Sequence, residues 1–426
     1  MSQWAARARS QQRLALVATV CGAVLVVYLI RLIGMGHTEV VRSDYLSTQT
    51  GGVLVAEGRG SQLYVDAVQA PVYARLVGGD HTGDLLFNHA PLTAVMDAPI
   101  SGLDPVMGHR LWSLIQFLLM TIGCGVVALA APWPKRTRRL LPVAATLAAL
   151  VGGGTLPMLT AGQDLGTITL GLALAYVAWQ RGRLGIGAAV LVAGAAIAKP
   201  HLALGLLAFM AGWRDRRILW GALAGGLSAV AVSVLAVGWT AVIAFVGTAI
   251  RSNGLPQGNF VGLTGLFASW FGEGTGATVM ASICGAGAVA LAVALGVAVR
   301  RDRSRVGPAL IAATLLSLLA SPHTFVHDLT LLAPMMVVAL AEAARRAVSG
   351  AWPARASQAV VALWLLLVLA AAIDSAVLLP PAVGRLTPLV LILAAAVACR
   401  AVWPARLPVV GPEPSVAAEP RATYVV

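Results

Sequence analysis

Long apolar runs, separated by short clusters of arginine, restrict what this sequence can fold into. The runs approach the ~20 residues that a helix needs to cross the hydrocarbon core of a bilayer. Only 11% of the residues are charged and 58% are apolar, whereas soluble domains carry about 25% charged residues. The polar surface is therefore too small for a soluble enzyme, and the sequence predicts an all-α, polytopic membrane protein.

We expect twelve membrane-spanning helices. The first is interpreted as a retained helix because it is long enough to span and no small-residue cleavage site follows it. The fifth and sixth are short and have an alternative interpretation as a hairpin that does not fully cross. The half-apolar, proline-broken region 85–105 is expected to be re-entrant or interfacial. The predicted spans are 14–33, 109–131, 140–158, 165–180, 184–198, 202–213, 218–238, 276–299, 306–320, 329–344, 358–378 and 388–403.

The basic residues predict the orientation. With a cytoplasmic N-terminus, 22 of the 30 basic residues fall on the cytoplasmic side, as the positive-inside rule requires. Both termini are then cytoplasmic in a multi-pass protein of the cell membrane. The net charge of +13 reflects these loops, and we expect no nucleic-acid partner.

This topology gives one membrane-embedded domain over residues 1–405 and a disordered tail over 406–426, which is rich in proline. Two long loops, 34–108 and 239–275, lie outside the cytoplasm. Most acidic residues and the histidines fall on the same outer side. Any chemistry is therefore expected there.

Candidate site residues occur in five outer segments. Asp44 follows the first span, and a carboxylate near the bilayer surface is suited to act as a general base; the alternative is a helix N-cap. Gln163 lies in a polar turn between two spans, and the alternative is a simple loop without a role in the site. Lys199 lies in a short apolar hairpin, where a cation is costly and suited to hold a phosphate; the alternative is snorkelling to the interface.

The remaining candidates come from the second and fifth of these outer segments. Tyr64, Asn88 and His89 lie on an amphipathic background typical of an interfacial helix or of ordinary interfacial anchoring. His323, four residues before His327, shares one face with it if the segment is helical. Phosphate contact or proton relay fits these histidines better than zinc binding. Asp328 has the alternative role of a helix cap.

These segments together resemble glycosyltransferase family 87 of the GT-C superfamily, formerly a domain of unknown function. The resemblance covers roughly residues 14–400 and rests on the order of five short motifs. Where the family usually has Tyr-Pro-Pro, this chain has Asn88, His89, Ala90 and Pro91. This departure leaves open a substrate that differs from that of better-known members. The motifs are SDYLSTQTGGVLVAEGRGSQLY, FNHAPLTAVMDAPI, AGQDLGTITL, AIAKPHLAL and SPHTFVHDLTLLAP.

The resemblance implies a GT-C-type fold and transfer of a sugar from a polyprenyl-phosphate donor to a cell-envelope glycolipid or glycan outside the membrane. Mannose is the favoured sugar and arabinofuranose the next. Asp44 is the expected base, and Lys199, His323 and His327 are candidates to neutralise the leaving phosphate. We expect no cofactor and no metal ion. A membrane transporter or flippase, and a non-catalytic family member, are the alternatives.

Overall fold

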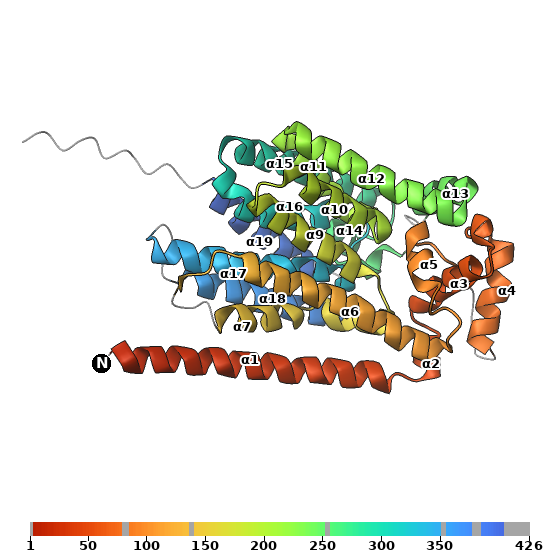
Figure 1. Ribbon diagram of the computed structural model, residues 1–426, viewed down its shortest axis with the longest axis horizontal. Helices are drawn as coiled ribbons and strands as arrows, with labels where there is room; N and C mark the ends of the chain where they lie inside the picture. Colours follow the sequence, from red (N-terminus) through yellow and green to blue (C-terminus); the bar gives the residue numbers. More distant parts are fainter. Residues whose placement is uncertain are drawn as a thin grey trace, which may run out of the picture.

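The computed structural model describes residues 3–78, 85–135, 140–251, 256–350, 355–376 and 385–403. Every regular element within these ranges is a helix (Figure 1). The predicted all-α fold is therefore confirmed for the described part of the chain. The predicted disordered tail lies outside it, and the division into one domain stays a prediction.

The apolar runs form a bundle of long helices. By length and hydropathy, seven described helical segments are able to cross a membrane, or eight when α7 and α8, bent by 50° at their junction, count as one span. The other predicted spans are helical but shorter, so twelve crossings stays a prediction. The bundle helices are α1 (Gln3–Gly34), α6 (Pro105–Ala130), α7 (Leu141–Leu150), α8 (Thr155–Ala161), α9 (Leu165–Gln180), α10 (Leu184–Ile197), α11 (Leu204–Trp213), α12 (Arg216–Val237), α15 (Thr275–Arg301), α16 (Val306–Ala320), α17 (Ala333–Val348), α18 (Ala356–Ser375) and α19 (Leu386–Val402).

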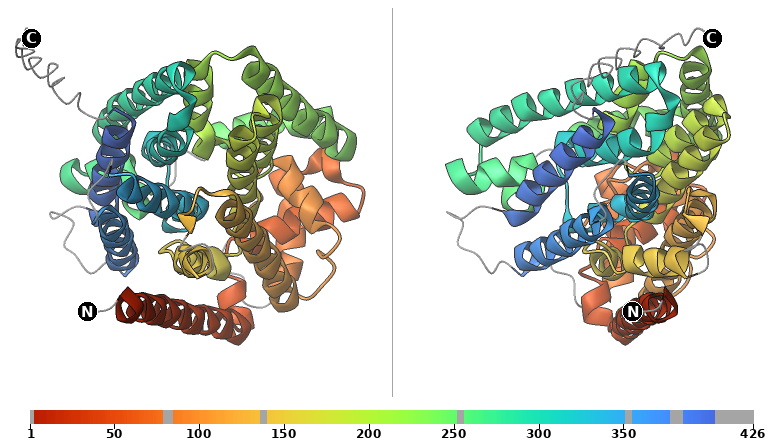
Figure 2. Two further views of the ribbon diagram at one scale, coloured as in Figure 1. Left: turned by 60° about the vertical axis from the view of Figure 1, so that its left-hand side comes forward. Right: turned by 90° about the vertical axis from the view of Figure 1, so that its left-hand side faces the viewer.

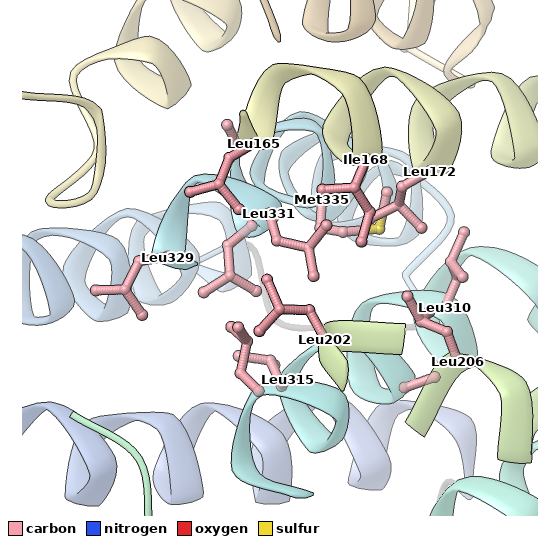
Figure 3. Close-up of a cluster of buried hydrophobic side chains, with 14 of the residues drawn as sticks. Leu165, Ile168, Leu172, Leu202, Leu206, Leu310, Leu315, Leu329, Leu331 and Met335 are labelled. Atoms are coloured by element: carbon pink, nitrogen blue, oxygen red, sulfur yellow. The ribbon is translucent and has the colours of Figure 1, made fainter. Parts of the chain in front are cut away.

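Branched apolar side chains and glycines hold the bundle together. Leucines of α9, α11 and α16 meet in a buried cluster with Met335 of α17 (Figure 3). Elsewhere, the backbones approach closely: a Cβ on Gly225 of α12 would overlap the carbonyl oxygen of Ala189 in α10. Small residues are favoured at such crossings because association within lipid depends on close packing.

The predicted outer loops form a helical layer at one end of the bundle, at the opposite end of α1 from its N-terminus (Figures 1 and 2). The helix α5 has only seven residues, in agreement with the expectation that 85–105 does not span. The layer contains α2 (His37–Val40), α3 (Tyr45–Ala56), η1 (Gly60–Gln62), α4 (Asp66–Val77), α5 (Pro91–Asp97) and α13 (Trp239–Arg251). The rest of the second loop forms η6 (Gln257–Asn259) and α14 (Leu263–Phe271), and α14 packs against α15.

Short 3-10 helices begin or precede several bundle helices. They are η4 (Pro200–Ala203) before α11, η7 (Arg303–Arg305) before α16, and η8 (Val326–Leu332) before α17. Both η4 and η8 lie at the end that carries the helical layer, whereas η7 lies at the opposite end. This opposite end is called the basic end below, because Arg300, Arg301, Arg345 and Arg346 occupy the last turns of its helices.

Candidate functional site

A cavity of about 540 Å³ opens where the helical layer meets the turns of the bundle. Its wall combines residues from the starts of α3 and α5, the turn before α9, the α10–η4 turn, α13 and the segment before η8. The fold thus brings together segments that are far apart in the sequence. Seven of the nine predicted site residues line the cavity: Asp44, Asn88, His89, Gln163, Lys199, His323 and His327.

Asp44 occupies the N-cap position of α3, but its side chain makes no capping hydrogen bond. Its Oδ2 instead accepts a hydrogen bond of 2.5 Å from Nε2 of Gln163. Simple capping therefore does not explain this carboxylate, which has one oxygen held by an amide at the cavity wall.

Gly162, in the left-handed backbone conformation, sets the position of Gln163 after α8. Gly162 ends α8 with φ of +68°, a conformation that costs L-residues with a Cβ. The indole Nε1 of Trp112 donates to the Gly162 carbonyl at 2.9 Å, and a Cβ on Gly162 would lie 2.6 Å from Cβ of Tyr45. The predicted polar turn is thus tightly packed against the start of α3, beside Asp44.

Lys199 is paired with a fully buried carboxylate. Its Nζ donates to Oδ1 of Asp328 at 2.9 Å and lies 2.9 Å from Nε2 of His327. The Lys199 side chain is only 11% exposed, so snorkelling to water does not describe it. The second oxygen of Asp328 accepts from the backbone N–H of Phe325 at 2.8 Å. Asp328 therefore both caps η8 and neutralises Lys199 from behind the cavity wall.

Two side chains hold the segment FNHAP, residues 87–91, in place. The Tyr64 hydroxyl, which does not line the cavity, donates to the carbonyl oxygen of His89 at 2.7 Å. Nδ1 of His89 lies 3.7 Å from Oδ2 of Asp164, and the same oxygen accepts from Thr93 at 2.8 Å. Burial opposes ionisation of Asp164, but the hydrogen bond and charge of His89 outweigh it, with smaller contributions from Lys199 and Thr93, and lower its pKa.

Two histidine rings lie in contact at the cavity wall, tilted by 43° to each other. The ring centroids of His201 and His323 are 4.1 Å apart, and burial lowers the pKa of His323. Nε2 of His201 and Nδ1 of His323 are buried without a hydrogen-bond partner in the described part of the chain. The condition for a shared helical face of His323 and His327 is not met, because residues 321–325 are not helical. The two side chains reach the same cavity from the bend before η8 and from η8 itself.

The cavity lining combines the carboxylate of Asp44 with Lys199 and four histidines, whereas the carboxylates of Asp164 and Asp328 do not line it. No group of three or more His, Cys, Asp or Glu residues within the described ranges is arranged to hold a metal ion. A carboxylate suits proton acceptance, and a lysine beside histidines suits an anionic group.

The model of glycosyltransferase family 87 matches residues 87–322, more than half of the chain. The chain belongs to glycosyltransferase family 87. No curated protein and no solved structure matches it.

The predicted membership of glycosyltransferase family 87 is therefore confirmed. Within the matched range lie Asn88, His89, Gln163 and Lys199. The other five predicted site residues lie outside it. The fold places Asp44, His323 and His327 at the cavity wall, whereas Tyr64 and Asp328 do not line the cavity.

Three features of this glycosyltransferase site are absent from the predicted site residues. His201 directly follows the Lys199–Pro200 pair, and Asp164 directly follows Gln163, so adjacency to assigned residues was a usable signal. The third is α13, which contributes Phe245, Val246 and Ile250 to the cavity wall. Its apolar periodicity within a predicted outer loop indicated an amphipathic helix.

Proposed function

We propose that this glycosyltransferase moves a sugar from a polyprenyl-phosphate donor to a cell-envelope glycolipid or glycan on the extracytoplasmic side of the membrane. Mannose is the first sugar to test and arabinofuranose the second. The observation that carries the proposal is the single cavity lined by both Asp44 and the Lys199–His327 pair. Asp44 is the proposed general base.

In the proposed reaction, an acceptor hydroxyl attacks the anomeric carbon while Asp44 takes its proton. The bond between the anomeric carbon and the phosphate oxygen breaks, and polyprenyl phosphate leaves with the additional negative charge. Lys199, His323 and His327 stabilise this charge. General base catalysis supplies about 10²–10⁴-fold, so positioning and charge stabilisation supply the rest.

The apolar wall of the cavity that α13 forms supports a lipid-borne donor. Phe245, Val246 and Ile250 of α13 face the cavity, and other positions of this helix are apolar and exposed, including Trp239 and Ile243. Trp239 and Ile243 lie on the same helical face as Val246 and Ile250, so one apolar stripe of α13 continues from the exposed surface of the helix into the cavity wall. The first isoprene units of the donor are proposed to lie along α13.

The test is transfer from radiolabelled polyprenyl-phosphate mannose in membranes that contain the chain or its Asp44→Asn variant. We expect a labelled glycolipid with the unchanged chain and at least a 100-fold loss with Asp44→Asn. The matched control is Asp66→Asn, an exposed carboxylate at the first turn of α4, which should leave transfer unchanged.

Transfer by Asp44→Asn near the unchanged rate would contradict the role of the base. Absence of product with both the mannose and the arabinose donor would contradict the proposed reaction. It would favour the transporter or the non-catalytic alternative.

A further inference from the structure

A second cavity, of about 610 Å³, lies among α16, α17, α18 and α19. These four helices lie together on the side of the bundle away from α12 and α13 (Figure 2). The cavity wall is almost entirely apolar and includes Leu315, Met335, Leu363 and Trp364. None of its lining residues belongs to the first cavity. An apolar space of this size is suited to a hydrocarbon chain.

The polar groups of this cavity gather toward the basic end. Its charged lining residues are Glu342 and Arg400. Oε2 of Glu342 is engaged by Arg345 at 2.7 Å and by Arg346 at 3.4 Å, so its charge is already neutralised. Arg400 is exposed and forms no salt bridge within the described ranges. The mouth of the cavity therefore keeps a net positive charge.

The depth of the cavity corresponds to one leaflet of a bilayer. Along α18, the lining runs from Ala356 at the basic end to Leu367. Eleven residues of helix rise about 16 Å, which is half of a hydrocarbon core of about 30 Å. A chain that enters at Arg400 would thus end near the middle of the membrane.

We propose that this cavity binds one anionic phospholipid from the leaflet at the basic end, with an acyl chain between α17 and α18 and its phosphate on Arg400. Arg345 lies at the end of α17, where it adds positive charge near the headgroup. Met335 and Met336, which line the cavity, are adaptable side chains that suit contact with a flexible chain. This site is independent of the proposed sugar transfer.

The test is native mass spectrometry of the full-length protein, titrated in detergent with phosphatidylglycerol or with phosphatidylcholine of the same acyl chains. We expect one tightly retained phosphatidylglycerol and weaker retention of phosphatidylcholine. Arg400→Gln should weaken phosphatidylglycerol binding about fivefold, the effect of one basic residue near an anionic headgroup. Arg216→Gln, at the start of α12 and away from the cavity, should leave binding unchanged.

A second pair of variants tests whether the acyl chain of the lipid occupies the cavity. Ala394→Phe fills the cavity and should abolish retention of the lipid, whereas Ala396→Phe, exposed on the same helix outside the cavity, should not. Equal retention of both lipids, or binding unaffected by Ala394→Phe, would overturn the proposal. Displacement of phosphatidylglycerol by an equimolar amount of polyprenyl phosphate would also overturn it and identify a carrier site instead.

Discussion

Nε2 of Gln163 donates a 2.5 Å hydrogen bond to Oδ2 of Asp44, across 119 residues of sequence. The bond joins the turn before α9 to the start of α3, so the orientation of the carboxylate depends on the bundle behind it. A proposed base must be oriented toward its substrate to act. Gln163 is therefore a positioning residue for Asp44.

Gln163→Ala should lower kcat about 10–100-fold and change KM little. The lost hydrogen bond to a charged group contributes about 1.5–3 kcal/mol, and its loss leaves Asp44 free to rotate. The measurement is the steady-state rate of transfer in purified membranes. Gln62→Ala, at an exposed glutamine of η1, is the control. A rise in KM alone would indicate that Gln163 binds substrate rather than positioning the base.

The buried pair of Lys199 and Asp328 predicts unequal effects on stability and activity. Lys199→Met should destabilise the fold by about 3–5 kcal/mol, because it leaves the fully buried Asp328 carboxylate without its partner. The double variant Lys199→Met, Asp328→Asn should recover most of that loss, since no unpaired charge remains. Thermal unfolding in detergent measures both.

Transfer activity should not recover in the double variant, because the cation proposed to face the phosphate is still missing. Recovery of both stability and activity would show that Lys199 is only structural. The Asp328→Asn single variant completes the double-mutant cycle.

The sequence predicted the membrane class, the helical segments and the residues of the cavity because these depend on local signals. Apolar runs, arginine clusters and isolated polar groups are visible without a fold. The contact between Gln163 and Asp44 depends on how α8 and α3 pack. The spacing of residues along the sequence does not predict that packing. The case of His323 and His327 is similar: i, i+4 spacing implies one face only if the backbone is helical, and residues 321–325 are not.

Asp97 predicts a pH dependence of stability. Neither of its buried carboxylate oxygens has a hydrogen-bond partner among the described residues, and burial raises its pKa to about 7. The unfolded value is about 3.9, so the folded chain binds this proton more tightly. Its contribution to the free energy of unfolding is thus full below pH ~4 and is lost as the pH rises to about 7.

Stability of the unchanged chain should therefore fall by about 2 kcal/mol between pH 5 and pH 7 relative to Asp97→Asn, which keeps a neutral side chain of the same shape. Unfolding temperatures in detergent at pH 5, 6, 7 and 8 measure the difference. Asp66→Asn, at an exposed carboxylate, should keep the slope of the unchanged chain. Parallel pH profiles for the chain and Asp97→Asn would contradict the assignment.

Two adjacent glycines of α12 predict opposite effects of the same substitution. A Cβ on Gly225 would overlap the backbone carbonyl of Ala189 in α10, whereas a Cβ on Gly226 would meet its nearest atom, Cγ1 of Val192, at an ordinary 3.6 Å. Gly225→Ala should therefore destabilise the bundle by about 1–3 kcal/mol through overpacking. Gly226→Ala should be neutral or stabilising by up to about 1 kcal/mol, since alanine favours the helix. Thermal unfolding of the two variants in the same detergent measures this difference, and equal unfolding temperatures would show that α10 and α12 do not pack at Gly225.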